Sequence, residues 1–231
     1  MAIQSNLFLH EKVMLLALRD EEGTIASGTM YQYAIGAAIL AELLLNQRIA
    51  LDESRKKKLV NLISPTPLGE PLIDQCLEKI GNAKRRASLQ TWVSRFAGVK
   101  NLKHRVAQQL CDRGILRADE DKILLLFTRK IYPEINPKPE RELIERLRKA
   151  IFSDARSLDP RTVVLVSLAK NCDLLRIPFD KKKLRERKKR IEGIVNGEMT
   201  GEAAKAAMEA MQAAIFVCCI MPAVLASTTT G

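Results

Sequence analysis

The sequence is poor in the residues and motifs from which catalytic and metal-binding sites are built. It has only two histidines and five cysteines in 231 residues, and no two cysteines are spaced as CxxC. It also lacks a glycine-rich phosphate loop, a GxSxG nucleophile turn and an HExxH zinc helix. We therefore expect no catalytic residue, no metal site and no cofactor, and we interpret the chain as a protein that is not an enzyme.

The odd number of cysteines argues against a disulfide framework. The five are Cys76, Cys111, Cys172, Cys218 and Cys219. We interpret them as buried or free thiols in a reducing compartment. The neighbouring pair at 218 and 219 could accept an acyl chain, but its apolar surroundings favour a place in the core.

Long hydrophobic runs are also missing. The longest, Ala213–Ala226, has 14 residues and contains a proline, whereas a membrane-spanning helix needs about 20. The N-terminus has no basic start followed by an apolar core, so it does not read as a secretory signal. We expect a cytoplasmic protein that is either free or attached to a membrane surface from outside the bilayer core.

Aromatic residues make up only 4% of the chain, so leucine, isoleucine, valine and alanine must build the core. Leucine and alanine favour helices, and the expected fold is mainly α. Hydrophobic periodicity predicts helices over residues 9–20, 30–46, 71–79, 88–98, 101–113, 140–152, 161–171, 180–196 and 202–220. The segment 30–46 is apolar on nearly all sides, which predicts a buried helix at the centre of the fold.

Two short β-hairpins complete the expected architecture. One pairs residues 48–51 with 58–63, and the other pairs 115–116 with 123–127 around an acidic turn at 119–121. At this length one shared core is possible. We expect a single globular domain over 1–231, with tails at 1–6 and 227–231.

Positive charge is abundant, and it is concentrated. The net charge is +11, while residues 1–54 carry three basic and seven acidic residues. Residues 81–113 and 181–190 each carry eight basic residues against one acidic residue, and 55–58 is a third basic cluster. Such patches favour phospholipid headgroups, nucleic acid or acidic proteins as partners.

The helix predicted over 101–113 combines an apolar face with basic residues. Leu102, Val106 and Leu110 fall on one face, and Lys100 and Lys103 lie on the other, about one turn apart. Two ammonium groups at that spacing can reach one phosphate. The four apolar residues 123–126 in the next hairpin cannot all face one side of a strand. They either find a partner in the core or insert into a membrane, with Ile123 and Leu124 at the inserting tip.

The run at 181–190 carries the densest positive charge and leaves three readings open. It is a solvated helix face, a polybasic membrane contact or a nucleic-acid contact. No aromatic residue lies between Phe179 and Phe216, so no base-stacking platform accompanies the charge. This absence argues against nucleic acid as a partner.

Four blocks of the sequence resemble the Golgi phosphoprotein 3 family. They are Leu7–Gly23, Ile39–Leu51, Leu68–Leu77 and Val99–Leu116, in the family order. The resemblance implies a helical domain with a four-helix core, a hydrophobic hairpin and a basic pocket for phosphatidylinositol 4-phosphate. In eukaryotic members, this domain lies on the cytosolic face of trans-Golgi membranes, binds the cytosolic tails of resident enzymes and supports vesicle traffic.

The resemblance also suggests site residues. Two arginines of the family's pocket correspond here to Lys100 and Lys103, with Arg105 beside them, and we expect Arg85 and Arg86 to add attraction for the headgroup. Lysine keeps the charge but acts as a point charge, without the bidentate geometry of arginine. Self-association through the second hairpin is a further expectation.

The chain departs from the family pattern between its first two helices. Relatives have a tryptophan and an arginine there, at positions that lie near Ser27 and Gly36, whereas residues 21–47 contain no Trp, Arg or Lys. Tyr31 and Tyr33 are the aromatics available nearby. Half of the family pocket is therefore absent, which favours a looser preference for anionic lipid.

The sequence thus predicts a peripheral membrane protein that binds anionic phospholipid, by resemblance phosphatidylinositol 4-phosphate, and acts as a Golgi trafficking adaptor if the source is eukaryotic. Two alternatives stay open. One is a basic protein associated with nucleic acid, and the other is a structural interaction module whose lipid pocket has decayed.

Overall fold

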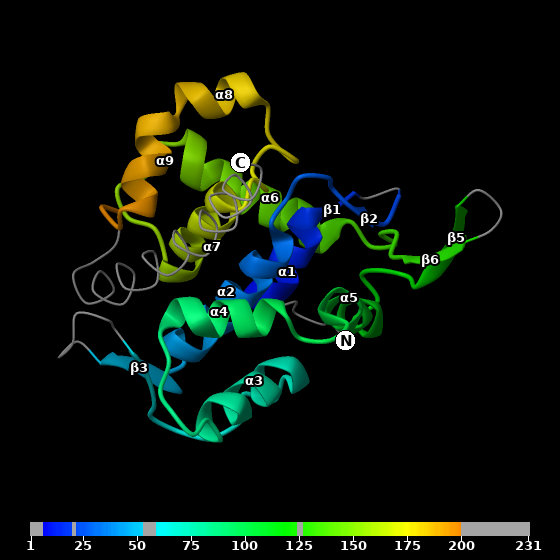
Figure 1. Cartoon of the computed structure of the whole chain (residues 1–231). Coiled ribbons are helices and arrows are strands. Elements are labelled where there is room, and N and C mark those ends of the chain that lie inside the picture. Colours follow the sequence, from blue (N-terminus) through cyan, green and yellow to red (C-terminus); the bar gives the residue numbers. More distant parts are fainter. Residues whose placement is uncertain (1–6, 20–21, 53–58, 124–126, 200–231) are drawn as a thin grey trace, which may run out of the picture.

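The computed structural model describes residues 7–19, 22–52, 59–123 and 127–199, and over these ranges the fold is mainly α, as predicted (Figure 1). The helices are α1 (Leu9–Ala17), α2 (Tyr31–Leu45), α3 (Pro71–Gly81), α4 (Leu89–Ala97), α5 (Leu102–Asp112), α6 (Lys138–Phe152), α7 (Pro160–Asn171), α8 (Lys181–Glu186) and α9 (Lys188–Val195). The strands are β1 (Leu18–Arg19), β2 (Thr24–Ile25), β3 (Ile49–Asp52), β4 (Leu59–Leu62), β5 (Asp119–Ile123) and β6 (Phe127–Ile131). The strands form separate antiparallel two-stranded sheets, in which β1 pairs with β2, β3 with β4, and β5 with β6.

Helix α2 lies at the centre of the fold, as its apolar sequence predicts. Every residue from Ala34 to Leu43 is buried, and α1, α4 and α7 all pack against this helix. These four helices form the expected core. The approach of α4 is close because position 36 is glycine: a Cβ there would lie 2.7 Å from the carbonyl oxygen of Val93.

Helix starts follow from side chains that accept hydrogen bonds from free backbone N–H groups. Ser88 accepts from the N–H of Thr91 and begins α4, as predicted. Glu70 and Asp159 do the same for α3 and α7, and a proline follows each of them at the first helical position.

The first helix ends at Ala17, earlier than the predicted end at Asp20. The chain turns there into a short sheet that the sequence did not indicate, in which Leu18 pairs with Ile25. Gly23 makes the turn with a φ of 58°, and a Cβ at this position would lie 2.3 Å from the backbone nitrogen of Pro133. Only glycine fits so close to the chain that follows the second hairpin.

The first predicted hairpin is confirmed, whereas the second is shifted in register. Strands β3 and β4 pair Ile49 with Leu62. In the second hairpin the acidic residues 119–121 form part of strand β5 and not the turn, and 115–116 form no strand. Asp121 is stabilised in the strand because it lies opposite Arg129, with 2.7 Å between its carboxylate and the guanidinium group.

The single helix predicted over 180–196 is wrong: the structure has two helices, α8 and α9, separated at Arg187. Helix α8 has no buried residue, whereas α9 buries Ile191 and Ile194. The change of direction lets the second helix pack against α7 while the first stays at the surface (Figure 1).

Buried hydrophobic residues from these helices form one core cluster. The assignment of the whole chain to a single domain stays a prediction, because the tails at 1–6 and 227–231 and the helix expected over 202–220 lie outside the described residues. In the ranges that the structure describes, no helix combines the length and hydrophobicity needed to cross a bilayer.

Candidate functional site

Helix α5 buries one face, as its periodicity predicts. Leu102, Val106 and Leu110 are all buried against the core. The helix begins one residue later than predicted, because Asn101 has a left-handed backbone with φ 58°. Asparagine tolerates that conformation better than most residues. Lys100 therefore lies in the turn before α5, exposed and without a hydrogen bond or ion pair from any described residue.

Lys103 lies near strand β6, because its ammonium group interacts electrostatically with Arg129 of that strand. Burial lowers the pKa of its ammonium group, and the nearby guanidinium of Arg129 lowers that pKa further. Burial also lowers the pKa of His104, with further lowering from Lys103 and Lys130. These four residues, Lys103, His104, Arg129 and Lys130, form what we call the α5–β6 basic cluster. Asp121 already offsets the charge of Arg129. A bound anion would offset the repulsion that remains among Lys103, Lys130 and a protonated His104.

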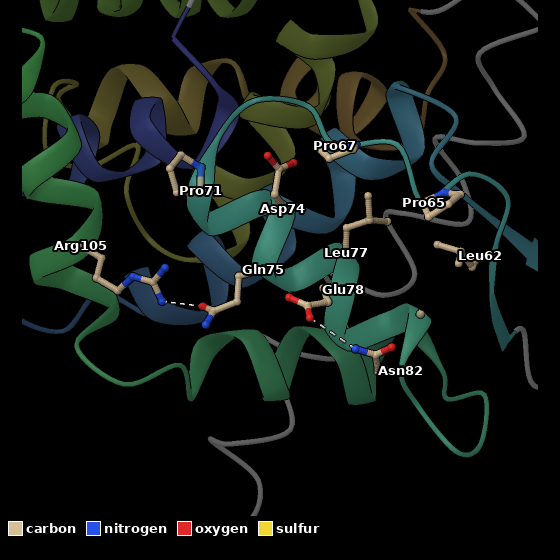
Figure 2. A pocket seen from close by; sticks show the side chains of 11 residues that line it. Leu62, Pro65, Pro67, Pro71, Asp74, Gln75, Leu77, Glu78, Asn82 and Arg105 are labelled. Carbon is tan, nitrogen blue, oxygen red and sulfur yellow. Dashed lines mark hydrogen bonds between the residues drawn. The ribbon is translucent and has the colours of Figure 1, made fainter.

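Arg105 belongs to the opposite side of α5. Its Nη1 donates a 2.6 Å hydrogen bond to Oε1 of Gln75 on α3. Figure 2 shows the guanidinium reaching toward α3, at the edge of a cavity of about 570 Å³ that Pro71 and Asp74 also line. The structure thus separates Arg105 from Lys103, although only one residue lies between them in the sequence.

Arg85 and Arg86 lie in the connection between α3 and α4. Arg86 donates to Asp52 at 2.9 Å and to Asn61 at 2.8 Å, so it joins this connection to both strands of the first hairpin. Arg85 is exposed. In Figure 1, β3 and the β5–β6 hairpin lie at opposite ends of the molecule. The five basic residues singled out from the sequence therefore do not converge on one point, and their role in binding stays a prediction.

The second hairpin extends away from the helices in Figure 1. Ile123, one of the two residues predicted to insert into a membrane, ends β5, and its backbone pairs with that of Phe127. Leu124, the other, lies outside the described residues. The base of this hairpin is tied to α5, because Nδ1 of His104 lies 2.8 Å from the hydroxyl of Tyr132.

Ser27 and Gly36, near which the family resemblance places a tryptophan and an arginine in other members, differ in their surroundings. Gly36 is buried against α4, so no larger side chain fits there. Ser27 is exposed, and its carbonyl accepts a 2.8 Å hydrogen bond from Nη2 of Arg176, which follows α7 in the chain. Sequence reasoning missed this arginine because 149 residues separate the two partners and no local pattern connects them.

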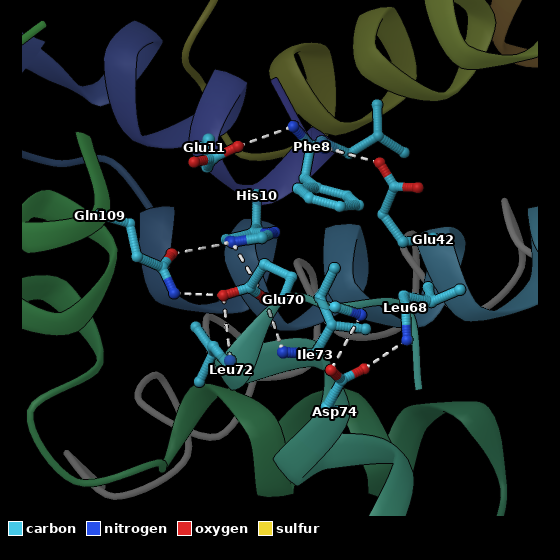
Figure 3. Close-up of polar contacts among 12 residues, drawn as sticks. Phe8, His10, Glu11, Glu42, Leu68, Glu70, Leu72, Ile73, Asp74 and Gln109 are labelled. Atoms are coloured by element: carbon cyan, nitrogen blue, oxygen red, sulfur yellow. Dashed lines mark hydrogen bonds and ion pairs between the residues drawn. The ribbon is translucent and has the colours of Figure 1, made fainter. Parts of the chain in front are cut away.

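A buried polar network fixes the position of α5 (Figure 3). The side chain of Gln109 contacts Nε2 of His10 at 3.2 Å, and its amide donates to Glu70. Glu70 also accepts from the N–H groups of Leu72 and Ile73 and so caps α3. One amide of α5 thus connects α1 with the start of α3.

Two further carboxylates hold the start of α1. Glu42 accepts a 2.8 Å hydrogen bond from the N–H of Leu9 and pairs with Arg161 at 2.6 Å. Glu11 accepts from the N–H of Phe8 and pairs with Arg113 at 2.7 Å. The carboxylates of Glu42 and Glu11 therefore stabilise the fold. Among the described residues, no three His, Cys, Asp or Glu side chains are grouped to hold a metal ion.

Among the described cysteines, Cys76 and Cys111 are free thiols, and Cys172 is buried. Burial raises the pKa of Cys76 to about 12, which makes this thiol unreactive. The pair at 218 and 219 lies outside the described residues.

The fold and the surface thus describe a mainly helical protein in which basic side chains of helix α5 lie beside a projecting β-hairpin. The family model for Golgi phosphoprotein 3 matches residues 9–211, and the chain belongs to that family. This confirms the resemblance seen in the sequence.

A curated relative is also similar. Vacuolar protein sorting-associated protein 74 of Schizosaccharomyces pombe is 26% identical over 175 residues, which cover 68% of this chain and 51% of the relative. The chain thus spans about half the length of the relative that it matches.

Proposed function

We propose that the protein is a peripheral membrane adaptor that binds anionic phospholipid headgroups, phosphatidylinositol 4-phosphate among them, at the start of α5. The observation that carries the proposal is the α5–β6 basic cluster, in which cations from α5 and β6 lie near one another. Burial, and then repulsion from Arg129, lowers the pKa of Lys103. Burial, and then repulsion from Lys103 and Lys130, lowers the pKa of His104. An exposed Lys100 precedes it in the chain. A phosphate monoester would offset this repulsion through charge-assisted hydrogen bonds.

Family membership supports the cellular part of the proposal. In a cell with a Golgi apparatus the protein would attach to the cytosolic face of that organelle and support trafficking, without catalysing a reaction. Its protein partners would be cytosolic tails of membrane enzymes. A second copy of the chain would associate through the β5–β6 hairpin, with Ile123 and Leu124 available for membrane insertion.

The glycine at position 36 and the serine at position 27 support a looser selectivity than a pocket with tryptophan and arginine would have. We expect binding to phosphatidylinositol 4-phosphate vesicles and also to phosphatidylserine vesicles. Each lysine near an anionic surface contributes about 1 kcal/mol, and added salt weakens this attraction.

Vesicle sedimentation tests the site directly. The double variant Lys100→Ala with Lys103→Ala should lose roughly 30-fold in affinity for anionic vesicles, from about 1 kcal/mol per lysine. The matched control is Lys79→Ala with Lys149→Ala, which removes the same charge from exposed positions on α3 and α6 and should bind as the parent does.

Equal losses in the two double variants would show that net charge alone drives binding and would contradict the site. Retention of binding in the first variant would do the same. A parent protein that binds neither vesicles nor a single-stranded oligonucleotide would instead favour a structural interaction module.

A further inference from the structure

The basic residues at 181–190 have two different environments. Some bind to carbonyl groups elsewhere in the fold, and others have unpaired charge at the surface. Arg187 donates from Nη2 to the carbonyl of Phe152 at 2.8 Å, and Arg190 donates from Nε to the carbonyl of Ala150 at 2.8 Å. Arg190 also reaches the carbonyl of Ala155. These two arginines satisfy carbonyls at and just beyond the end of α6, where helical partners are lacking. Their charge is therefore used within the fold.

Other residues of the run line a groove of about 550 Å³ between the end of α7 and helices α8 and α9. Its apolar lining consists of Leu175, Leu184 and Ile191. Leu175 and Ile191 are each only 5% exposed, so they lie recessed at the base, which we call the floor. A cavity of this size with apolar walls and a few polar groups has the usual features of a binding site.

The basic side chains of the groove are Lys170, Arg176, Lys181, Arg185 and Lys188, and its acidic ones are Asp173 and Glu192. Each acid already has a basic neighbour within the groove. Oδ2 of Asp173 lies 3.0 Å from Nη1 of Arg176, and Oε1 of Glu192 lies 3.8 Å from Nζ of Lys188.

The three basic side chains that remain have no such neighbour. The side chains of Lys170, Lys181 and Arg185 donate no hydrogen bond and form no ion pair within the part of the chain that the structure describes. The groove therefore presents uncompensated positive charge around an apolar floor. Complementarity requires a ligand that is anionic on one side and apolar on the other.

We infer that this α7–α8 groove binds an acidic segment of a partner protein, with apolar side chains on the floor and carboxylates beside Lys170, Lys181 and Arg185. A flat bilayer would touch the rim of the groove but would not reach Leu175 and Ile191, whereas single side chains of a peptide can. Among the described residues that line the groove, none is an aromatic residue on which a base could stack. An amphipathic helix laid in a groove is an established mode of peptide recognition.

This site is separate from the one proposed for lipid headgroups. Helices α8 and α5 lie well apart in Figure 1. The two proposals can therefore fail independently of each other.

Fluorescence anisotropy with the full chain tests the inference. The probe is a labelled helical peptide of about 14 residues, with glutamates on one face and leucines on the other. The variant Lys181→Glu with Arg185→Glu should weaken its binding by at least about tenfold, because like charges then face each other across the interface. The matched control is Lys182→Glu with Lys189→Glu, which makes the same charge change at exposed positions outside the groove and should cost less than about threefold.

A second probe tests the floor. A peptide of equal charge with serine in place of leucine should bind at least about tenfold more weakly, since burial of apolar side chains is lost. Circular dichroism and thermal unfolding establish that both double variants fold.

Three results would overturn the inference. The two double variants could weaken binding equally, which would reduce the effect to net charge. The serine peptide could bind as tightly as the leucine peptide. The leucine peptide could fail to bind while binding of the protein to phosphatidylserine vesicles requires Lys181 and Arg185. That result would make the groove a membrane contact.

Discussion

His104 and Tyr132 join helix α5 to the end of the second hairpin, with 2.8 Å between the imidazole Nδ1 and the phenolic oxygen. The same imidazole is influenced by Lys103 and Lys130, which together with burial lower its pKa. The neutral form of His104 is therefore favoured as long as no anion is bound. A negatively charged ligand that binds at the α5–β6 basic cluster should therefore change the pKa of His104.

A soluble headgroup should raise the pKa of His104. Binding of inositol 1,4-bisphosphate would offset the positive neighbours and favour the imidazolium, so the protein would take up a proton on binding. Affinity should consequently increase as the pH falls toward the lowered pKa of the unliganded imidazole, which lies below the ordinary value of about 6.5. An NMR titration of the imidazole resonances, with and without the headgroup, measures this. A pKa of His104 that stays the same or falls would place the ligand elsewhere.

The variant Gly36→Ala should destabilise the fold. The new Cβ would lie 2.7 Å from the carbonyl oxygen of Val93 and 3.0 Å from the backbone nitrogen of Ala97, so α2 and α4 would have to separate. Overpacking of this kind costs about 1–3 kcal/mol in the free energy of unfolding. Urea unfolding measures the change. Gly81→Ala is the control, because its Cβ would meet only the Leu62 side chain at 3.5 Å, and a similar loss there would contradict the packing argument.

The variant Glu42→Ala should be among the most destabilising single changes in α2. It removes a buried carboxylate that accepts from the N–H of Leu9 and pairs with Arg161. Breaking a buried pair costs about 3–5 kcal/mol, and we expect about 2–4 kcal/mol because the Arg161 side chain is 37% exposed. Glu42→Gln keeps an acceptor for Leu9 and should lose less. Equal stability of the two variants would mean that the backbone hydrogen bond contributes little.

The variant Arg187→Ala should lower stability, whereas Lys189→Ala should not. Arg187 donates to the carbonyl of Phe152 at 2.8 Å and lies 3.3 Å from Asp154, while Lys189 is exposed. A hydrogen bond from a charged group contributes about 1.5–3 kcal/mol. Because the Arg187 side chain is 38% exposed, solvent screening reduces the expected loss to about 1–2 kcal/mol. Thermal unfolding of the two variants compares residues of the same run directly. If both unfold at the same temperature, the arginine does not stabilise the end of α6.

The sequence predicted those parts of the fold that depend on local signals. The buried helix α2 followed from its uniform hydrophobicity, and the start of α4 followed from a serine cap. The second hairpin was predicted in the wrong register because three consecutive acids read as a turn. Only the structure shows Asp121 opposite Arg129.

The candidate site was harder to predict, because it depends on contacts between distant segments. Sequence reasoning grouped Lys103 with Arg105 as near neighbours, yet packing turns the first toward β6 and the second toward Gln75 of α3. Arg129 was missed because it lies beyond the strand that was expected. The capping role of Arg187 was hidden within a run of similar charges.

The amide of Gln109 has a consequence for the kinetics of ligand capture. Its contacts to His10 and Glu70 lock α5 onto α1 and α3 before any ligand arrives, so the helix that carries Lys103 does not have to become ordered when an anion binds. A preformed surface avoids the entropic cost of ordering on association. Encounter with a charged target should then follow long-range electrostatics, with an association rate that depends strongly on ionic strength.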